Sequence, residues 1–117
     1  MPAAPNHKPL RGIFPIMQTP YTDAGTLDLP VLAKEVHFLD HCGVHGMVWP
    51  QLASEYFNLS REERLAGAES IVAAARGVRP AIVIGVQADT SAQAVDYAQH
   101  ATKLGADALI ALPPRKE

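Results

Sequence analysis

Four short, almost continuously apolar runs are separated by longer stretches with the periodicity of amphipathic helices. The runs span 12–19, 46–50, 81–86 and 108–112. Strands that are apolar at successive positions are typical of a parallel sheet covered on both faces, whereas half-exposed antiparallel strands alternate apolar with polar residues. The stretches between the runs are long enough for a crossover helix. The sequence therefore predicts an α/β fold in which four parallel strands lie side by side in chain order, joined by three helices.

Each expected helix has a capping residue at its start and a glycine at its end. The second helix has the strongest signal, because Ser60 and Glu63 have the spacing of a capping box. Pro30 falls in the first turn of the first helix, where proline is tolerated. The expected limits are Asp28 to Gly43, Ser60 to Gly77, and Thr90 or Ser91 to Gly105.

The composition favours a small-molecule partner. The chain has 117 residues and a net charge of -2, so it offers no electrostatic basis for binding nucleic acid or an anionic membrane. Its single cysteine, Cys42, is expected to be a buried, reduced thiol, which fits a cytoplasmic protein. Residues 1–11 are rich in proline and polar residues, and we expect them to form a flexible leader before a domain at 12–117.

Five strings of residues, taken in order, resemble the dihydrodipicolinate synthase and N-acetylneuraminate lyase family. They are GIFPIMQTPYTDAGTLD at 12–28, CGVHG at 42–46, LSREER at 59–64, IGVQADTS at 84–91 and KLGADA at 103–108. Each string is weak alone, but five in order at the family's spacing are specific. The resemblance implies the N-terminal half of a (β/α)8 TIM barrel, since a whole barrel needs about 250 residues.

The resemblance also implies a chemistry. Members of the family form a Schiff base between a lysine and the ketone of pyruvate or a related 2-oxo acid, and then make or break a carbon–carbon bond. The family's lysine lies on strand six, which would follow Glu117, and no strand expected here carries a lysine. The chain alone is therefore expected to be inactive. A non-catalytic half-barrel that serves as an assembly or binding module is the alternative.

The same resemblance places a substrate carboxylate on the loop after the second strand. The family's Gly-x-x-Gly-Glu loop aligns with Gln51, Leu52, Ala53, Ser54 and Glu55. Leu52 and Ala53 replace hydroxyl residues and both glycines are lost, so backbone donors, or a re-aimed Ser54 or Gln51, would have to hold the carboxylate. Alternatively, Leu52 and the nearby Tyr56 simply pack.

Two further positions follow strand ends. Thr19 follows the first strand and is expected either to line the site or to hold the loop by a hydrogen bond. Arg115 aligns with the family's proton-shuttling tyrosine, but an arginine stays protonated and can only clamp a carboxylate. A solvated tail is the simpler interpretation of Arg115.

Other ligands are not indicated. His37 and His41 have the i, i+4 spacing of a metal pair, but they lie at the end of a helix with no third ligand, and a surface role is expected. No glycine-rich phosphate motif is present, so we expect neither a metal nor a cofactor. The expected partners of the complete protein are a 2-oxo acid and further copies of itself. The isolated half-barrel is expected to dimerise, to aggregate or to remain molten, because its first and fourth strands present unpaired apolar edges.

Overall fold

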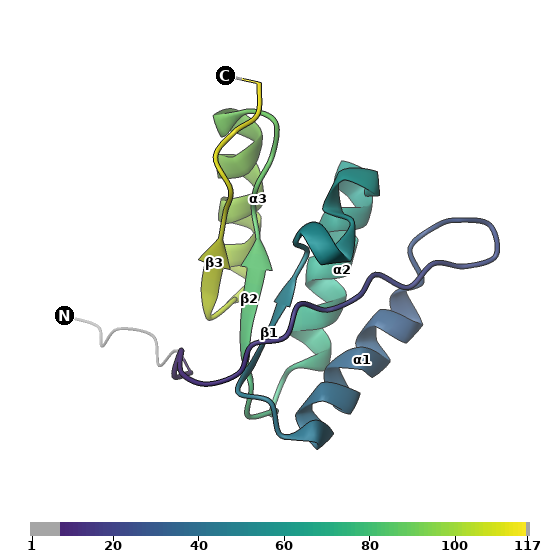
Figure 1. The fold of residues 1–117 in the computed structure, drawn as a ribbon, viewed down its shortest axis with the longest axis vertical. Coiled ribbons are helices and arrows are strands. Elements are labelled where there is room, and N and C mark those ends of the chain that lie inside the picture. The colour runs from purple at the N-terminus through teal and green to yellow at the C-terminus, as the bar shows by residue number, and fades with distance from the viewer. Residues whose placement is uncertain (1–7, 117) are drawn as a thin grey trace.

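The computed structural model describes residues 8–116. Its strands form one parallel sheet in the order β1-β2-β3, and each connection passes through a helix (Figure 1). The α/β fold with sequential parallel strands is confirmed. The elements are α1 (Leu29–Cys42), β1 (Gly46–Trp49), the short 3-10 helices η1 (Leu52–Ser54) and η2 (Tyr56–Asn58), α2 (Arg61–Ala74), β2 (Ala81–Gly85), α3 (Ser91–Leu104) and β3 (Ala108–Ile110).

The first of the four expected strands is an extended segment rather than a regular strand. Ile16 forms an isolated parallel bridge with Val48, whose N–H donates to the Pro15 carbonyl at 3.1 Å. One step earlier, the Gly46 N–H donates to the Ile13 carbonyl at 3.2 Å. Pro15 has no N–H to donate in return, so the ladder is interrupted there. The segment still runs beside β1 in the expected order and direction.

The capping signals place the starts of all three helices correctly. The Asp28 carboxylate accepts a hydrogen bond from the Val31 N–H at 3.2 Å, and Thr90 caps α3 in the same way. Gly43 and Gly105 follow α1 and α3 with φ of +83° and +91°, a left-handed conformation that glycine adopts without strain.

Helix α2 begins with the predicted capping box but ends earlier than expected. The Glu63 N–H donates to the Ser60 hydroxyl at 3.1 Å, and the Ser60 N–H donates to the Glu63 carboxylate at 3.0 Å. The helix ends at Ala74, three residues before Gly77. Gly77 has a φ of +81° and lies in the turn that follows.

One face of the sheet packs against the helices and the other is open. Met47, Trp49, Ile82 and Ile84 pack in one core with the helices. Val48 belongs to the opposite face, since side chains alternate along a strand, and no helix in the described part of the chain covers this face (Figure 1). There, residues from the first segment and all three strands line an apolar hollow of about 340 Å³: Leu10, Phe14, Val48, Val83, Ala108, Leu109 and Ile110.

Two expectations outside the sheet have different outcomes. Residues 1–7 of the expected leader lie outside the described residues. At Lys8 the side-chain ammonium donates to the Pro80 carbonyl at 3.0 Å, and the backbone N–H donates to the Asp107 carboxylate at 3.2 Å. The expectation of a buried Cys42 was wrong. Its thiol is exposed, because six residues beyond Val36 the helix has turned about 120° from the buried stripe. No helix in the described part of the chain is long and apolar enough to span a membrane.

Candidate functional site

Polar segments gather at the carboxyl ends of the strands. The extended segment leads to Thr19, β1 leads into the loop at 50–60 that contains η1 and η2, and β2 leads into 86–90. Because the strands are parallel, these three connections meet at one edge of the sheet. That edge is where barrel enzymes place their catalytic and binding groups.

Thr19 and Ser54 fasten the loop after β1 to the extended segment. The Thr19 hydroxyl donates to the Ser54 carbonyl and accepts from the Trp49 indole N–H at 3.0 Å. The Ser54 hydroxyl donates to the Met17 carbonyl. Both hydroxyl residues are buried. Of the two roles foreseen for Thr19, the structure shows the one that holds the loop, and Ser54 has no free donor for a ligand.

The Gln51 side chain also makes a hydrogen bond within the fold. Its amide nitrogen donates to the Gln87 side-chain carbonyl at 2.6 Å, and the Gln87 amide nitrogen donates to the Pro50 carbonyl at 2.8 Å. Gln87 is only 1 % exposed. At Gly85 an added Cβ would lie 1.9 Å from the Pro50 carbonyl oxygen, so the loop approaches β2 as closely as a glycine allows. The paired amides therefore lock the start of the loop onto β2.

The middle of the loop presents backbone rather than side-chain donors. Leu52 is 60 % exposed and Ala53 is exposed, so Leu52 does not pack as the simpler interpretation required, whereas Tyr56 is buried. The N–H groups of Leu52 and Ala53 open the first turn of η1 and have no acceptor within residues 8–116. Glu55 follows with a φ of +60°, which turns the chain sharply between η1 and η2.

Arg64 is the functional-site residue that the sequence analysis missed. It is 6 % exposed, and its two terminal nitrogens donate to the carbonyls of Gln87 at 2.7 Å and Gly85 at 2.9 Å. Burial lowers the pKa of Arg64. Its position in the sequence could have indicated this burial. Arg64 lies four residues before Ala68, so the two side chains fall on the same buried stripe of α2.

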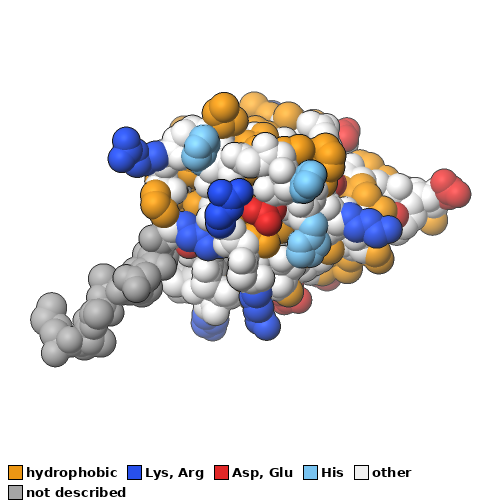
Figure 2. Space-filling model, turned by 90° about the horizontal axis from the view of Figure 1, so that it is seen from below, with side chains coloured by type: hydrophobic (Ala, Val, Ile, Leu, Met, Phe, Trp, Pro, Cys, Tyr) orange, Lys and Arg blue, Asp and Glu red, His pale blue; other side chains and the backbone are white. Residues whose placement is uncertain are grey.

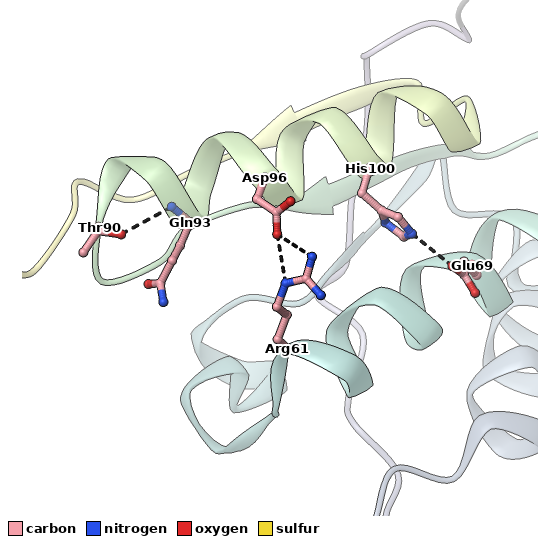
Figure 3. A network of polar contacts seen from close by, with 6 residues as sticks. All are labelled: Arg61, Glu69, Thr90, Gln93, Asp96 and His100. Atoms are coloured by element: carbon pink, nitrogen blue, oxygen red, sulfur yellow. Dashed lines mark hydrogen bonds and ion pairs between the residues drawn. The ribbon is translucent and has the colours of Figure 1, made fainter.

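Arg64 also forms part of a pocket of about 280 Å³ between the starts of α2 and α3. The charged and polar residues that line it include Arg61, Arg64, Asp89, Gln93, Tyr97 and Arg115. Beyond the pocket, the two helices are joined by Arg61 with Asp96 at 2.8 Å and by His100 with Glu69 at 3.0 Å (Figure 3). Arg115 is exposed and faces this inter-helix pocket together with Arg64.

The remaining candidates lie elsewhere. His37 and His41 lie near the carboxyl end of α1, away from the loops after the strands. Within residues 8–116 no group of three or more histidine, cysteine, aspartate or glutamate side chains is arranged to hold a metal ion.

Parallel strands in chain order, crossover helices on one face and polar loops at the carboxyl ends define part of a (β/α)8 barrel. The model of the dihydrodipicolinate synthetase family matches residues 9–115, and the chain belongs to this family. The resemblance found in the five sequence strings is thereby confirmed.

Two curated relatives illustrate the match. The chain is 33 % identical over 107 residues to the probable 2-dehydro-3-deoxy-D-pentonate aldolase YjhH of Escherichia coli K12, covering 92 % of this chain and 35 % of that protein. It is 32 % identical over 104 residues to 4-hydroxy-tetrahydrodipicolinate synthase of Methanothrix thermoacetophila, covering 89 % of this chain and 34 % of that one.

Solved structures agree. YagE, an Escherichia coli K12 prophage protein of the dihydrodipicolinic acid synthase family in complex with pyruvate, matches with a TM-score of 0.84 and 30 % identity over 90 % of this chain and 35 % of its own. Proteus mirabilis N-acetylneuraminate lyase matches with a TM-score of 0.83 and 28 % identity over the same shares. The chain spans about a third of the length of these relatives.

Proposed function

We propose that the chain is the N-terminal part of a Schiff-base-forming carbon–carbon lyase or synthase, of the class I aldolase type, that acts on pyruvate or a related 2-oxo acid. Family membership, the pyruvate complex of YagE and the aldolase description of YjhH support this proposal. In the complete protein, residues 12–117 would form the first part of the barrel and residues 1–11 would lead into it. The complete protein would be a cytoplasmic homo-oligomer.

The free backbone N–H groups in the loop after β1 are the main structural support for the proposal. The side chains of Gln51 and Ser54 donate to groups within the fold, whereas the N–H groups of Leu52 and Ala53 lie without an acceptor in residues 8–116 at the catalytic edge of the sheet. Two adjacent N–H groups are suitable donors for a carboxylate, and a charge-assisted bond to each is stronger than a neutral one. Gln51, Ser54 and Thr19 would hold this backbone in place, and the turn at Glu55 would shape it.

The nucleophile would come from another part of the complete protein. The four lysines are Lys8, Lys34, Lys103 and Lys116, and none lies in β1, β2 or β3. A Schiff-base lysine needs a desolvated position that lowers its pKa, as a strand in a barrel interior supplies. The chain would therefore contribute carboxylate binding and no covalent catalysis. Arg115 could add a second carboxylate contact but no proton transfer.

Reductive trapping tests this division of labour. The chain is incubated with pyruvate and borohydride, and the intact mass is measured. We expect no stoichiometric adduct, and a complete family enzyme serves as the positive control. A single modified lysine located by peptide mapping would show that the nucleophile lies within this chain.

A substitution tests the loop itself. In an intact relative that keeps this loop, Ala53→Thr should tighten pyruvate binding by about 1 kcal/mol, or about fivefold, because it adds one hydroxyl donor for the carboxylate. Ala92→Thr, at an exposed position of α3, is the matched control. Unchanged or weaker binding after Ala53→Thr would mean that the carboxylate is not held at this loop.

A non-catalytic half-barrel module is the second candidate. It is favoured by the loss of the loop hydroxyls at Leu52 and Ala53, and by Arg115 at the position that aligns with the family's tyrosine. The genomic reading frame separates the two. A continuation that supplies a strand-six lysine supports the enzyme, whereas a stop after Glu117 supports the module.

A further inference from the structure

A second hollow, lined in part by basic side chains, lies at the opposite end of the sheet, below the amino-terminal ends of the strands. Its volume is about 210 Å³. Three separate segments build it: the chain before the extended segment, the turn between α1 and β1, and the connection from α2 to β2. Its lining residues are Pro9, Arg11, Gly43, Val44, His45 and Arg79.

The charges around this hollow are unbalanced. Arg11 and Arg79 both line it, and no carboxylate from residues 8–116 does. Neither arginine side chain has a hydrogen-bond or ion-pair partner in the described part of the chain. Figure 2 views this end of the molecule and shows several Lys, Arg and His side chains on it, with an acidic side chain among them. Both arginines are exposed, and an anion in the hollow would be attracted by two positive charges at once.

His45 supplies a third donor of fixed orientation. Its Nδ1 atom accepts a hydrogen bond from the Ile13 N–H at 2.9 Å, so the neutral ring carries its proton on Nε2. The ring also packs directly against Gly12, where an added Cβ would lie 2.3 Å from it. The preorganised ring therefore costs little further entropy when its Nε2–H binds a ligand.

One effect opposes an anion here. The carboxyl end of α1 contributes partial negative charge to the same region. Its last carbonyls are already partly neutralised, because those of Leu39 and Asp40 accept hydrogen bonds from the Gly43 N–H. Two full positive charges exceed the roughly half charge of a helix end.

Size and donor geometry select the ligand. The hollow is smaller than the 300–1,000 Å³ typical of sites for drug-sized molecules, so it suits one small group. Planar guanidinium groups match the paired oxygens of a phosphate. We propose that Arg11, Arg79 and His45 form a binding site for a phosphate group at the end of the barrel opposite the catalytic edge.

Calorimetric titration of the whole chain tests this site. Inorganic phosphate and glycerol phosphate are titrated separately, in chloride buffer of constant ionic strength. We expect saturable binding of at least one of them, weakened about tenfold or more by Arg79→Gln and by Arg11→Gln. The matched control is Arg76→Gln. Arg76 is an exposed arginine in the same connection from α2 to β2 as Arg79, but it does not line the hollow.

The two ligands distinguish the source of the phosphate. Tighter binding of inorganic phosphate indicates the free ion, and tighter binding of glycerol phosphate indicates a phosphorylated small molecule. The proposal is overturned if neither ligand gives saturable binding, or if Arg76→Gln weakens binding as much as Arg79→Gln does. The second result would mean that only the general positive charge of this face attracts anions.

Discussion

The guanidinium carbon of Arg64 lies 3.8 Å from the centroid of the Tyr97 ring, so the buried cation of α2 is covered by an aromatic side chain of α3. The same guanidinium donates to the backbone carbonyls of Gly85 and Gln87 at the end of β2. Arg64 thereby joins two helices to the end of β2, from which the connection at 86–90 starts.

Replacing Arg64 should weaken the fold markedly. Arg64→Met keeps much of the side-chain volume but leaves two buried carbonyls without donors, which should lower the free energy of unfolding by roughly 2–4 kcal/mol. Urea unfolding at one fixed protein concentration measures the change. Arg61→Gln is the control, because its ion pair with Asp96 is exposed and should contribute little. Equal effects of the two substitutions would contradict the role assigned to Arg64.

The Thr19 hydroxyl should also contribute to the free energy of unfolding, because it holds the loop after β1. Thr19→Val preserves shape but removes the donor to Ser54 and the acceptor for the Trp49 indole, so we expect a loss of about 1–3 kcal/mol. Trp49 fluorescence during unfolding reports the change directly at the altered contact. Thr102→Val, which removes an exposed hydrogen bond within α3, should have a smaller effect. No loss of stability in Thr19→Val would contradict the role of this hydroxyl in holding the loop.

Stability should fall as the pH rises toward neutrality because of Glu35. Burial raises the pKa of Glu35 from 4.5 to about 7, although the Gln18 N–H donates to it and partly offsets the shift. Between these values the folded chain binds the proton that the unfolded chain has released, so stability is greatest below about pH 4.5 and is lost up to about pH 7.

The comparison of native chain and Glu35→Gln isolates this effect from other carboxylates. At pH 8 the variant should be more stable by on the order of 1 kcal/mol, a discounted value because the carboxyl is only half-buried. The difference should vanish at pH 4. Parallel stability curves for the two proteins across this range would show that the Glu35 carboxyl ionises freely in the folded chain.

The open face of the sheet should make the isolated chain associate. Ile13, Leu109, Ile110 and Leu112 are between 37 % and 68 % exposed, and the apolar hollow over β1 to β3 has no cover within residues 8–116. Contiguous apolar surface of this kind promotes association. Sedimentation should therefore show dimers or larger species, with strong binding of an apolar dye.

Single charges test which surface is responsible. Leu109→Lys should reduce association, whereas Val95→Lys, at an exposed apolar position of α3, should not. A native chain that sediments as a monomer, unfolds sharply and binds no dye would contradict the account of an incomplete barrel.

Local patterns predicted most of the helix limits and the order of the strands. The caps at Asp28, Ser60 and Thr90 work through hydrogen bonds that span three residues, so the information is contained in the sequence at that point. Apolar runs at crossover spacing likewise determined parallel neighbours, because short right-handed connections allow few other arrangements. The missing N–H of Pro15 was also visible in the sequence, although its effect depends on the register with Gly46.

The candidate site, by contrast, was decided by tertiary structure. Gln51 could be read as a ligand donor until β1 and β2 came together and paired its amide with Gln87, which is 36 residues away. Arg64 was one charge among several until packing on Tyr97 buried it. A sequence shows which donors and acceptors a chain carries, but burial removes water as a partner, and only the packed fold determines which of those groups then satisfy one another.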